Sequence, residues 1–160
     1  MQTTILQTNN KKDFEYCAQI MCASEPWISL KRNYQQCLSA FDGDYKEIYV
    51  ATQNDTIEGF IILQMQGTFK GYIQTIAVAA NARGKGIGTL LISFAEKRIL
   101  EISPNVFMCV SSFNTAAQKL YYRLGYEKIG VLKDFIVKGY DEILLRKTSG
   151  TLSEFIVKSE

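Results

Sequence analysis

A glycine-rich turn has the clearest chemical character in this 160-residue chain. Glycines let a ligand approach the backbone closely, and the first N–H groups of a helix point outward at its N-terminus. Two cations at the same place add an attraction for phosphate oxygens. We therefore predict a phosphate-binding turn, against the alternative that the glycines only shape a tight strand-to-helix connection. The segment consists of Arg83, Gly84, Lys85, Gly86, Ile87, Gly88 and Thr89.

The spacing of these glycines disfavours two common phosphate ligands. The dinucleotide pattern G-x-G-x-x-G fails, because Thr89 stands where the third glycine belongs. The nucleoside-triphosphate loop also fails, because no G-K-[ST] follows the required spacer. A nucleotide-binding regulatory domain is therefore a weak alternative.

The residues that are missing restrict the chemistry further. The chain contains no histidine, which excludes Ser-His-Asp and Cys-His catalysis and histidine-bound metals. Its four cysteines form no C-x-x-C pair, so a zinc site would need all of them from distant elements. We expect no metal, and buried thiols in a reducing compartment. The cysteines are Cys17, Cys22, Cys37 and Cys109.

Two blocks of the sequence resemble one enzyme family. A strand at 76–78 followed by Arg83-x-x-Gly86-x-Gly88 is similar to the acetyl-CoA signature of the GNAT superfamily of N-acetyltransferases. The segment 114–126 resembles the Asn-Ala-Tyr-Gly helix of the same superfamily, through Asn114, Ala117, Leu120, Tyr121, Gly125 and Tyr126. The resemblance extends over about residues 3 to 147. It implies acetyl-CoA as co-substrate and a primary amine as acceptor.

The resemblance also implies which residues bind the cofactor. The backbone of Ile76, Ala77 and Val78 would hold the pantetheine arm, and an N–H at about Val78 would polarise the thioester carbonyl. Such an oxyanion donor is typically worth about 3–4 kcal/mol. The turn 83–89 would wrap the pyrophosphate, and Asn114 would bind the pantetheine arm. The alternatives are a plain core strand at 76–78 and a helix N-cap at Asn114.

Tyr121 is the predicted catalytic residue under this resemblance. A phenol with pKa near 10 can donate to a departing thiolate whose conjugate thiol has a pKa near 8.5. The alternative is an ordinary core aromatic, because Tyr121 shares an apolar helix face with Ala117 and Leu124. The neighbouring Tyr122 should face elsewhere, about 100° around the helix.

The general base is not evident from the sequence. Some family members carry a glutamate five residues before the motif asparagine, and that position is Cys109 here. The loop that carries Glu25 and Trp27 commonly lines the acceptor site in the family, so we predict these two residues as substrate-binding. Glu47, Glu58 and a water chain are further candidates for the base, and a solvated loop residue is the plain alternative for Glu25.

The apolar periodicity predicts the elements that would position these residues. We expect strands at 5–8, 48–52, 57–66, 72–79, 106–110, 126–132 and 136–146. Amphipathic helices are expected from Asp13, over 30–40, from Ile87 to before Pro104, and from Asn114 to Gly125. This order predicts an α/β (α+β) fold with a mixed, mostly antiparallel sheet of about seven strands flanked by about four helices.

Composition and length limit the class of protein. One domain over residues 1–148 and a polar tail over 149–160 are expected. A net charge of +2 is too weak for a nucleic-acid surface, and no apolar run approaches the ~20 residues that cross a bilayer. We expect a cytoplasmic enzyme in which the amine attacks acetyl-CoA directly in a ternary complex. The alternative is a non-catalytic acyl-CoA sensor, and a homodimer stays open.

Overall fold

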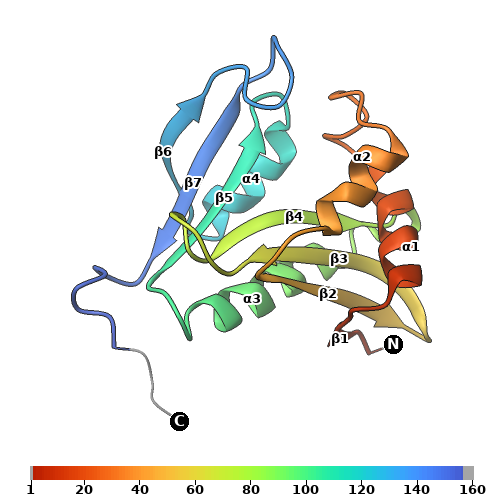
Figure 1. Ribbon diagram of the computed structural model, residues 1–160, viewed down its shortest axis with the longest axis horizontal. Helices are drawn as coiled ribbons and strands as arrows, with labels where there is room; N and C mark the ends of the chain where they lie inside the picture. Colours follow the sequence, from red (N-terminus) through yellow and green to blue (C-terminus); the bar gives the residue numbers. More distant parts are fainter. Residues whose placement is uncertain (1, 157–160) are drawn as a thin grey trace.

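The computed structural model describes residues 2–156, which form one mixed sheet with helices on both faces (Figure 1). Within these residues the sheet has seven strands in the order β1-β2-β3-β4-β5-β7-β6. The strands are β1 (Thr4–Gln7), β2 (Lys46–Gln53), β3 (Thr56–Gln64), β4 (Tyr72–Val78), β5 (Asn105–Ser111), β6 (Glu127–Leu132) and β7 (Glu142–Thr148). The helices are α1 (Lys11–Cys22), α2 (Tyr34–Leu38), α3 (Ile87–Ile99) and α4 (Thr115–Arg123). The predicted fold and element order are confirmed.

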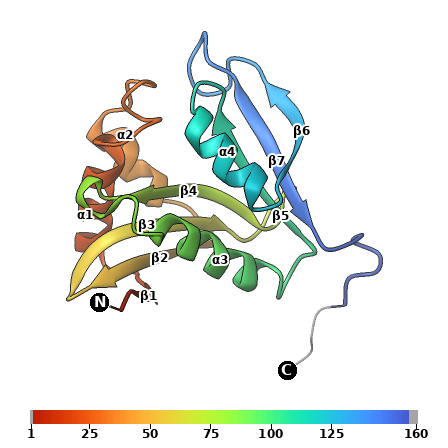
Figure 2. The ribbon, with the colours of Figure 1, turned by 180° about the vertical axis from the view of Figure 1, so that it is seen from behind.

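Alternating residues of the central strands bury both faces of the sheet. On β2, Ile48 and Val50 pack with α1 and α2, whereas Tyr49 and Ala51 belong to the core under α3 and α4. This period of two is what a strand buried on both sides requires. Figure 2 shows α3 and α4 together on the face opposite to α1 and α2.

The sheet divides between β4 and β5, its only parallel pair among residues 2–156. These strands pair only at Tyr72 with Phe107 and at Ile73 with Met108, and then they diverge. The remainder of β4 therefore has a strand neighbour on one side alone. The divergence leaves an opening in the middle of the sheet, with main-chain groups along its edge.

The predicted helix over 30–40 is wrong in its first part. Residues 24–31 form turns, and α2 begins only at Tyr34, after a capping box between Asn33 and Gln36. The Asn33 side chain accepts from the Gln36 backbone N–H at 2.9 Å, and the Gln36 side chain accepts from the Asn33 backbone N–H at 2.9 Å. This reciprocal cap fixes the helix start. Lys31, at a φ of 53°, is incompatible with a helix running through it.

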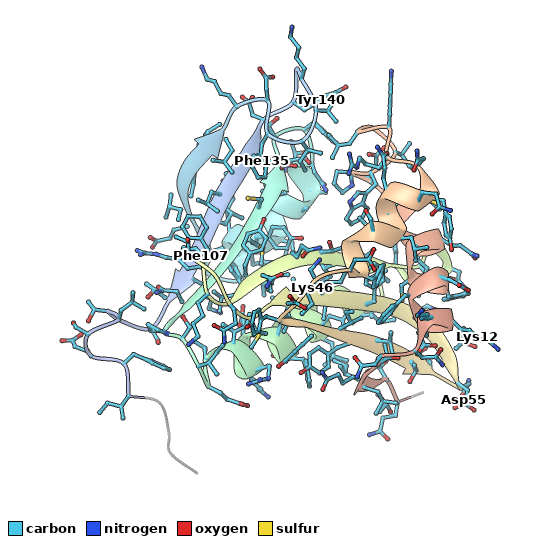
Figure 3. All side chains as sticks on the ribbon, in the orientation of Figure 1. Lys12, Lys46, Asp55, Phe107, Phe135 and Tyr140 are labelled. Atoms are coloured by element: carbon cyan, nitrogen blue, oxygen red, sulfur yellow. The ribbon has the colours of Figure 1, made fainter. Side chains whose placement is uncertain are left out.

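The predicted strand over 136–146 also begins too early, because residues 133–141 form a loop. The Asp134 side chain accepts from the Gly139 backbone N–H at 2.6 Å, and the Asp134 backbone N–H donates to the Asp141 carboxylate at 3.2 Å. These local bonds compete with strand pairing. Figure 3 shows Phe135 and Tyr140 on this loop. The helix α1 likewise begins at Lys11 behind an Asn10 cap, two residues before the predicted start.

The C-terminal segment after β7 is described as far as residue 156, so residues 157–160 of the predicted tail lie outside the described residues. None of the helices described for residues 2–156 has the length and apolarity that would let it cross a bilayer.

Gly71 directly precedes β4 and has no room for a side chain. Its φ is +85°, and an added Cβ would approach the backbone oxygen of Asn105 to 2.7 Å and would collide with the Ile99 side chain. Gly71→Ala should lower the free energy of unfolding by about 2–4 kcal/mol, from backbone strain and overpacking together. Urea denaturation measures this change. Gly130→Ala, where a Cβ meets nothing within 4 Å, is the control and should stay within about 0.5 kcal/mol.

Candidate active site

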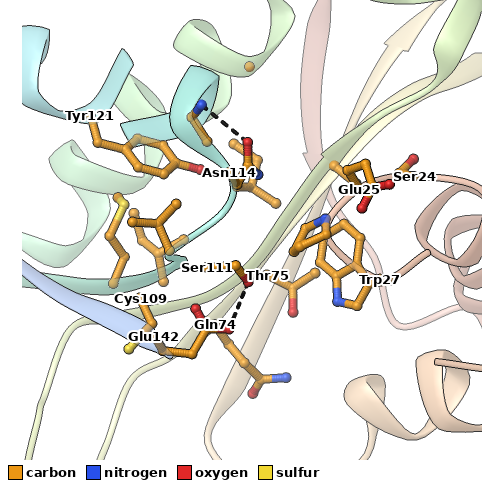
Figure 4. Close-up of a pocket in the computed structure, with 18 of the residues that line it drawn as sticks. Ser24, Glu25, Trp27, Gln74, Thr75, Cys109, Ser111, Asn114, Tyr121 and Glu142 are labelled. Carbon is orange, nitrogen blue, oxygen red and sulfur yellow. Dashed lines mark hydrogen bonds between the residues drawn. The ribbon is translucent and has the colours of Figure 1, made fainter. Parts of the chain in front are cut away.

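A cavity of about 490 Å³ occupies the opening between β4 and β5. Six parts of the chain line it: the loop after α1, the strands β4 and β5, the turn before α3 with α3 itself, the helix α4 with its N-cap, and the β6–β7 region. Figure 4 shows Tyr121 and Glu142 on one side of this cavity and the loop residues Ser24, Glu25 and Trp27 on the other. The predicted site residues that line it are Glu25, Trp27, Ile76, Ala77, Val78, Arg83, Gly88, Asn114 and Tyr121.

The backbone of β4 directs hydrogen-bonding groups into this cavity. Ala79 donates to the Glu58 carbonyl at 2.8 Å, so residues 79 and 77 of the antiparallel ladder bond toward β3. Because bonded and non-bonded positions alternate, Ile76 and Val78 point their N–H and C=O groups away from β3, toward the diverging β5. The Val78 carbonyl accepts from Arg83 Nε at 3.2 Å, which agrees with this direction. The main chain at Ile76 and Val78 therefore faces the cavity.

The glycine-rich turn forms an open anion-binding geometry at the start of α3. Gly84 and Gly86 have φ values of 75° and 79°, in the left-handed region that favours glycine. Gly86 is the N-cap and makes no side-chain cap, so the first N–H groups of α3 have no side-chain acceptor. A Cβ added at Gly84 or Gly86 would meet nothing within 4 Å, and one at Gly88 would meet only Val78 Cγ2 at 3.8 Å. The space beside these amides is open for a phosphate.

The other members of the turn differ in their roles. Ile87 is 3% exposed and belongs to the core under α3, so only its backbone is available at the turn. Lys85 and Thr89 are exposed beyond the cavity lining. Arg83 donates through Nη2 to Ser24 Oγ at 2.9 Å, in addition to its bond to Val78. Arg83 thus joins the end of β4 to the loop after α1, a link through Ser24 that sequence reasoning missed.

Asn114 precedes α4, Tyr121 lies within this helix, and both residues line the cavity. Asn114 is the N-cap, and its side-chain oxygen accepts from the Ala117 backbone N–H at 3.3 Å, so its amide nitrogen is the group left for a ligand. Tyr121 is 8% exposed and packs edge-on against Tyr126. Burial raises the pKa of Tyr121 to about 12, so the hydroxyl stays protonated at neutral pH. Tyr122, in contrast, is 43% exposed.

Only one of the predicted candidates for the base lines the cavity. Glu25 does so, and its carboxylate accepts from the Ser29 backbone N–H at 3.2 Å. Glu47 lies elsewhere, in an ion pair with Arg98 at 2.6 Å. Glu58 is on β3 and is absent from the lining described for residues 2–156.

Glu142, the first residue of β7, was not predicted as a site residue from the sequence. It is 4% exposed and lines the cavity beside Cys109 and Ser111 of β5. Ser111 Oγ donates to one carboxylate oxygen of Glu142 at 2.9 Å, and the other oxygen is buried without a partner. Burial raises the pKa of this carboxyl group. A charged residue directly before the apolar run 143–145 is an available signal, but it is also common at the end of a surface strand.

The cysteines contribute no cluster of ligands. All four are free thiols, and burial raises the pKa of Cys17 to about 12. Between residues 2 and 156 no three His, Cys, Asp or Glu side chains gather in a way that could hold a metal ion.

Comparisons with known proteins identify the family of this chain. Residues 14–126 match the acetyltransferase (GNAT) family. The chain is 33% identical over 101 residues to an uncharacterized N-acetyltransferase of Methanocaldococcus jannaschii, and 28% identical over 110 residues to an N-alpha-acetyltransferase of Sulfurisphaera tokodaii. These alignments span 62% and 61% of this chain, and 64% and 66% of the two relatives. The protein belongs to the GNAT family.

Solved structures show the same fold. The ribosomal-protein-S18-alanine N-acetyltransferase from Escherichia coli superposes with a TM-score of 0.76 at 17% identity, covering 97% of this chain and 99% of that one. An aminoglycoside 6'-N-acetyltransferase complexed with coenzyme A superposes with a TM-score of 0.71 at 16% identity, covering 92% and 97%. At sequence identities of 17% and 16%, these structural similarities show that the fold is shared.

Proposed function

We propose that this protein transfers an acetyl group from acetyl-CoA to a primary amine, by direct attack of the amine in a ternary complex. One observation carries the proposal. The free backbone edge of β4, Gly88 at the start of α3 and Tyr121 of α4 all line the space opened by the divergence of β4 and β5. A thioester with a phosphorylated tail would use all three features at once.

Each feature would act on a different part of acetyl-CoA. The N-terminal amides of α3, with the open space beside Gly84, Gly86 and Gly88, would hold the pyrophosphate. The main chain of Ile76 and the amide nitrogen of Asn114 would hold the pantetheine arm. The N–H of Val78 would bind the thioester oxygen, where negative charge develops as the amine attacks.

Tyr121 would assist the departure of the thiolate. Its raised pKa keeps the proton on the hydroxyl, so the group is ready to donate a hydrogen bond. Burial raises the pKa of the Tyr121 hydroxyl to about 12, whereas a thiol has a pKa near 8.5. The difference between these two pKa values is therefore larger than for an unburied phenol. The hydroxyl would therefore act first by donating a hydrogen bond to sulfur as charge develops, and the proton would follow.

The named relatives guide the choice of acceptor to test first. The Sulfurisphaera tokodaii protein is described as an N-alpha-acetyltransferase, which acts on α-amines. A free α-amine peptide is accordingly the first candidate acceptor, ahead of a lysine side chain and a polyamine.

The direct test measures thiol release from acetyl-CoA with three acceptors: a short peptide with a free α-amine, an Nα-blocked lysine peptide and spermidine. We expect amine-dependent release of CoA thiol, together with an acetylated product seen by mass spectrometry. Tight acetyl-CoA binding without transfer to any of the three would instead support the acyl-CoA sensor. A reaction that leaves an acetylated protein before the amine is added would contradict direct attack.

A further inference from the structure

Glu142 is a buried carboxylate in the proposed catalytic cavity without a full set of partners. Its Oε1 accepts from Ser111 Oγ at 2.9 Å, whereas Oε2 is buried and makes no hydrogen bond within the described residues 2–156. An unsatisfied buried oxygen on a charged group is costly, so proteins rarely retain one without a use. Figure 4 shows the Glu142 side chain beside Ser111, within the group of residues that lines the cavity.

The surroundings of Glu142 indicate what its free oxygen would accept. Its titratable neighbours are Tyr72 on β4 and Cys109 on β5, and burial raises the pKa of both, so both stay neutral near pH 7. Arg83, the cation of the cavity lining, donates to Ser24 and Val78. No ion pair is formed by Glu142 within residues 2–156. An incoming ammonium would supply the missing donor and the missing charge.

We propose that Glu142 binds the ammonium group of the acceptor and takes its proton as the general base. This inference rests on the proposed acetyl transfer. One N–H bond of the ammonium breaks, and its proton goes to Oε2. The nitrogen lone pair then forms the bond to the thioester carbon, and the C–S bond breaks with its electron pair on sulfur. A second nitrogen proton replaces the one that Tyr121 gives to sulfur, and water removes the proton from Glu142.

Glu142 fits this role better than Glu25 does. Glu25 is exposed on the loop after α1, and its carboxylate already accepts the Ser29 backbone N–H. Burial raises the pKa of Glu142 above its ordinary value, which makes this carboxylate a stronger proton acceptor than a solvated one. The Ser111 bond opposes this shift and holds the carboxylate in one orientation.

The test is the pH dependence of acetyl transfer by Glu142→Gln. Glutamine keeps the size of the side chain and an acceptor for Ser111, but it cannot take a proton. The variant must therefore use the small neutral fraction of the amine. At pH 7 we expect kcat/KM to fall about 10³-fold for the lysine peptide, whose amine has a pKa near 10.4, and about 10-fold for the α-amine peptide, with a pKa near 7.8. The loss for lysine should shrink about tenfold per pH unit up to pH 10.

Matched variants separate this result from a structural effect. Glu47→Gln removes a carboxylate outside the cavity and should leave kcat/KM near that of the wild type. Glu142→Asp retains a carboxylate, so its kcat/KM should fall less than that of Glu142→Gln, and the decrease should not depend on pH. The CoA-induced rise in melting temperature should persist in Glu142→Gln, which shows that the variant is folded and that its cofactor site is intact.

Three results would overturn the inference while leaving acetyl transfer standing. They are full wild-type activity of Glu142→Gln at pH 7, a loss that does not change with pH, and a pH-dependent loss that occurs in Glu25→Gln instead. Absence of amine-dependent thiol release from the wild type would overturn the proposed function itself, and that result is visible without any variant.

Discussion

Tyr121→Phe should lower kcat by about 10²–10⁴-fold, the usual effect of a positioned acid. The substitution deletes one hydroxyl and keeps the ring that packs against Tyr126. Within residues 2–156 this hydroxyl makes no hydrogen bond, so its removal should leave no buried group unpaired and folding should be unchanged. Steady-state kinetics with saturating amine measure kcat, and the KM for acetyl-CoA should change little, because the proton is needed only in the transition state.

The neighbouring residue provides the control. Tyr122→Phe removes the same hydroxyl from a side chain that is 43% exposed and is not part of the cavity lining, and its effect should be negligible. If Tyr121→Phe kept the full wild-type kcat with a good acceptor, water or another group would be protonating the thiolate. Equal losses in both variants would indicate a general effect on α4 rather than a chemical role.

Local sequence accounts for the backbone geometry of the glycine turn and for the helix cap at Asn114. Gly84 and Gly86 adopt positive φ values because the turn into α3 needs them, and Asn114 caps α4 because its side chain reaches the third amide of that helix. The glycine turn and the helix cap each depend on residues that are only a few positions apart in the sequence. The same holds for the order of helices and strands, which follows from apolar periodicity.

The parts that were missed depend on pairing between distant segments. Glu142 becomes a cavity residue because β7 pairs with β5, opposite Ser111, at the point where β4 has already diverged. No local pattern around residue 142 contains that information. The link from Arg83 to Ser24 likewise joins residues 59 positions apart. The starts of α2 and β7 were wrong for a different reason, since side-chain caps at Asn33 and Asp134 override the apolar pattern.

The start of α3 allows a substitution that separates folding from cofactor binding. Gly86 is a poor choice, because a side chain at its φ of 79° is strained whatever it does to a ligand. Gly88 has an ordinary helical position in the first turn, and an added Cβ would meet only Val78 Cγ2 at 3.8 Å. Aspartate is favourable in the first turn of a helix, through the helix dipole. Gly88→Asp should therefore fold as well as the wild type.

Gly88→Asp should nevertheless weaken CoA binding by roughly 10²-fold or more. The new carboxylate would enter the space that we propose for the pyrophosphate and would repel its charge. The cost is at least one charge-assisted hydrogen bond of about 1.5–3 kcal/mol. At a CoA concentration of 100 times the wild-type Kd, the stabilisation by CoA should drop from about 2.7 to about 0.4 kcal/mol. Thermal scans with and without CoA would show a shift of about 5–10 °C reduced to about 1 °C. Gly130→Asp makes the same exchange on β6, outside the cavity lining, and should keep the full shift. A folded Gly88→Asp variant with a wild-type CoA shift would show that this turn does not hold the phosphates.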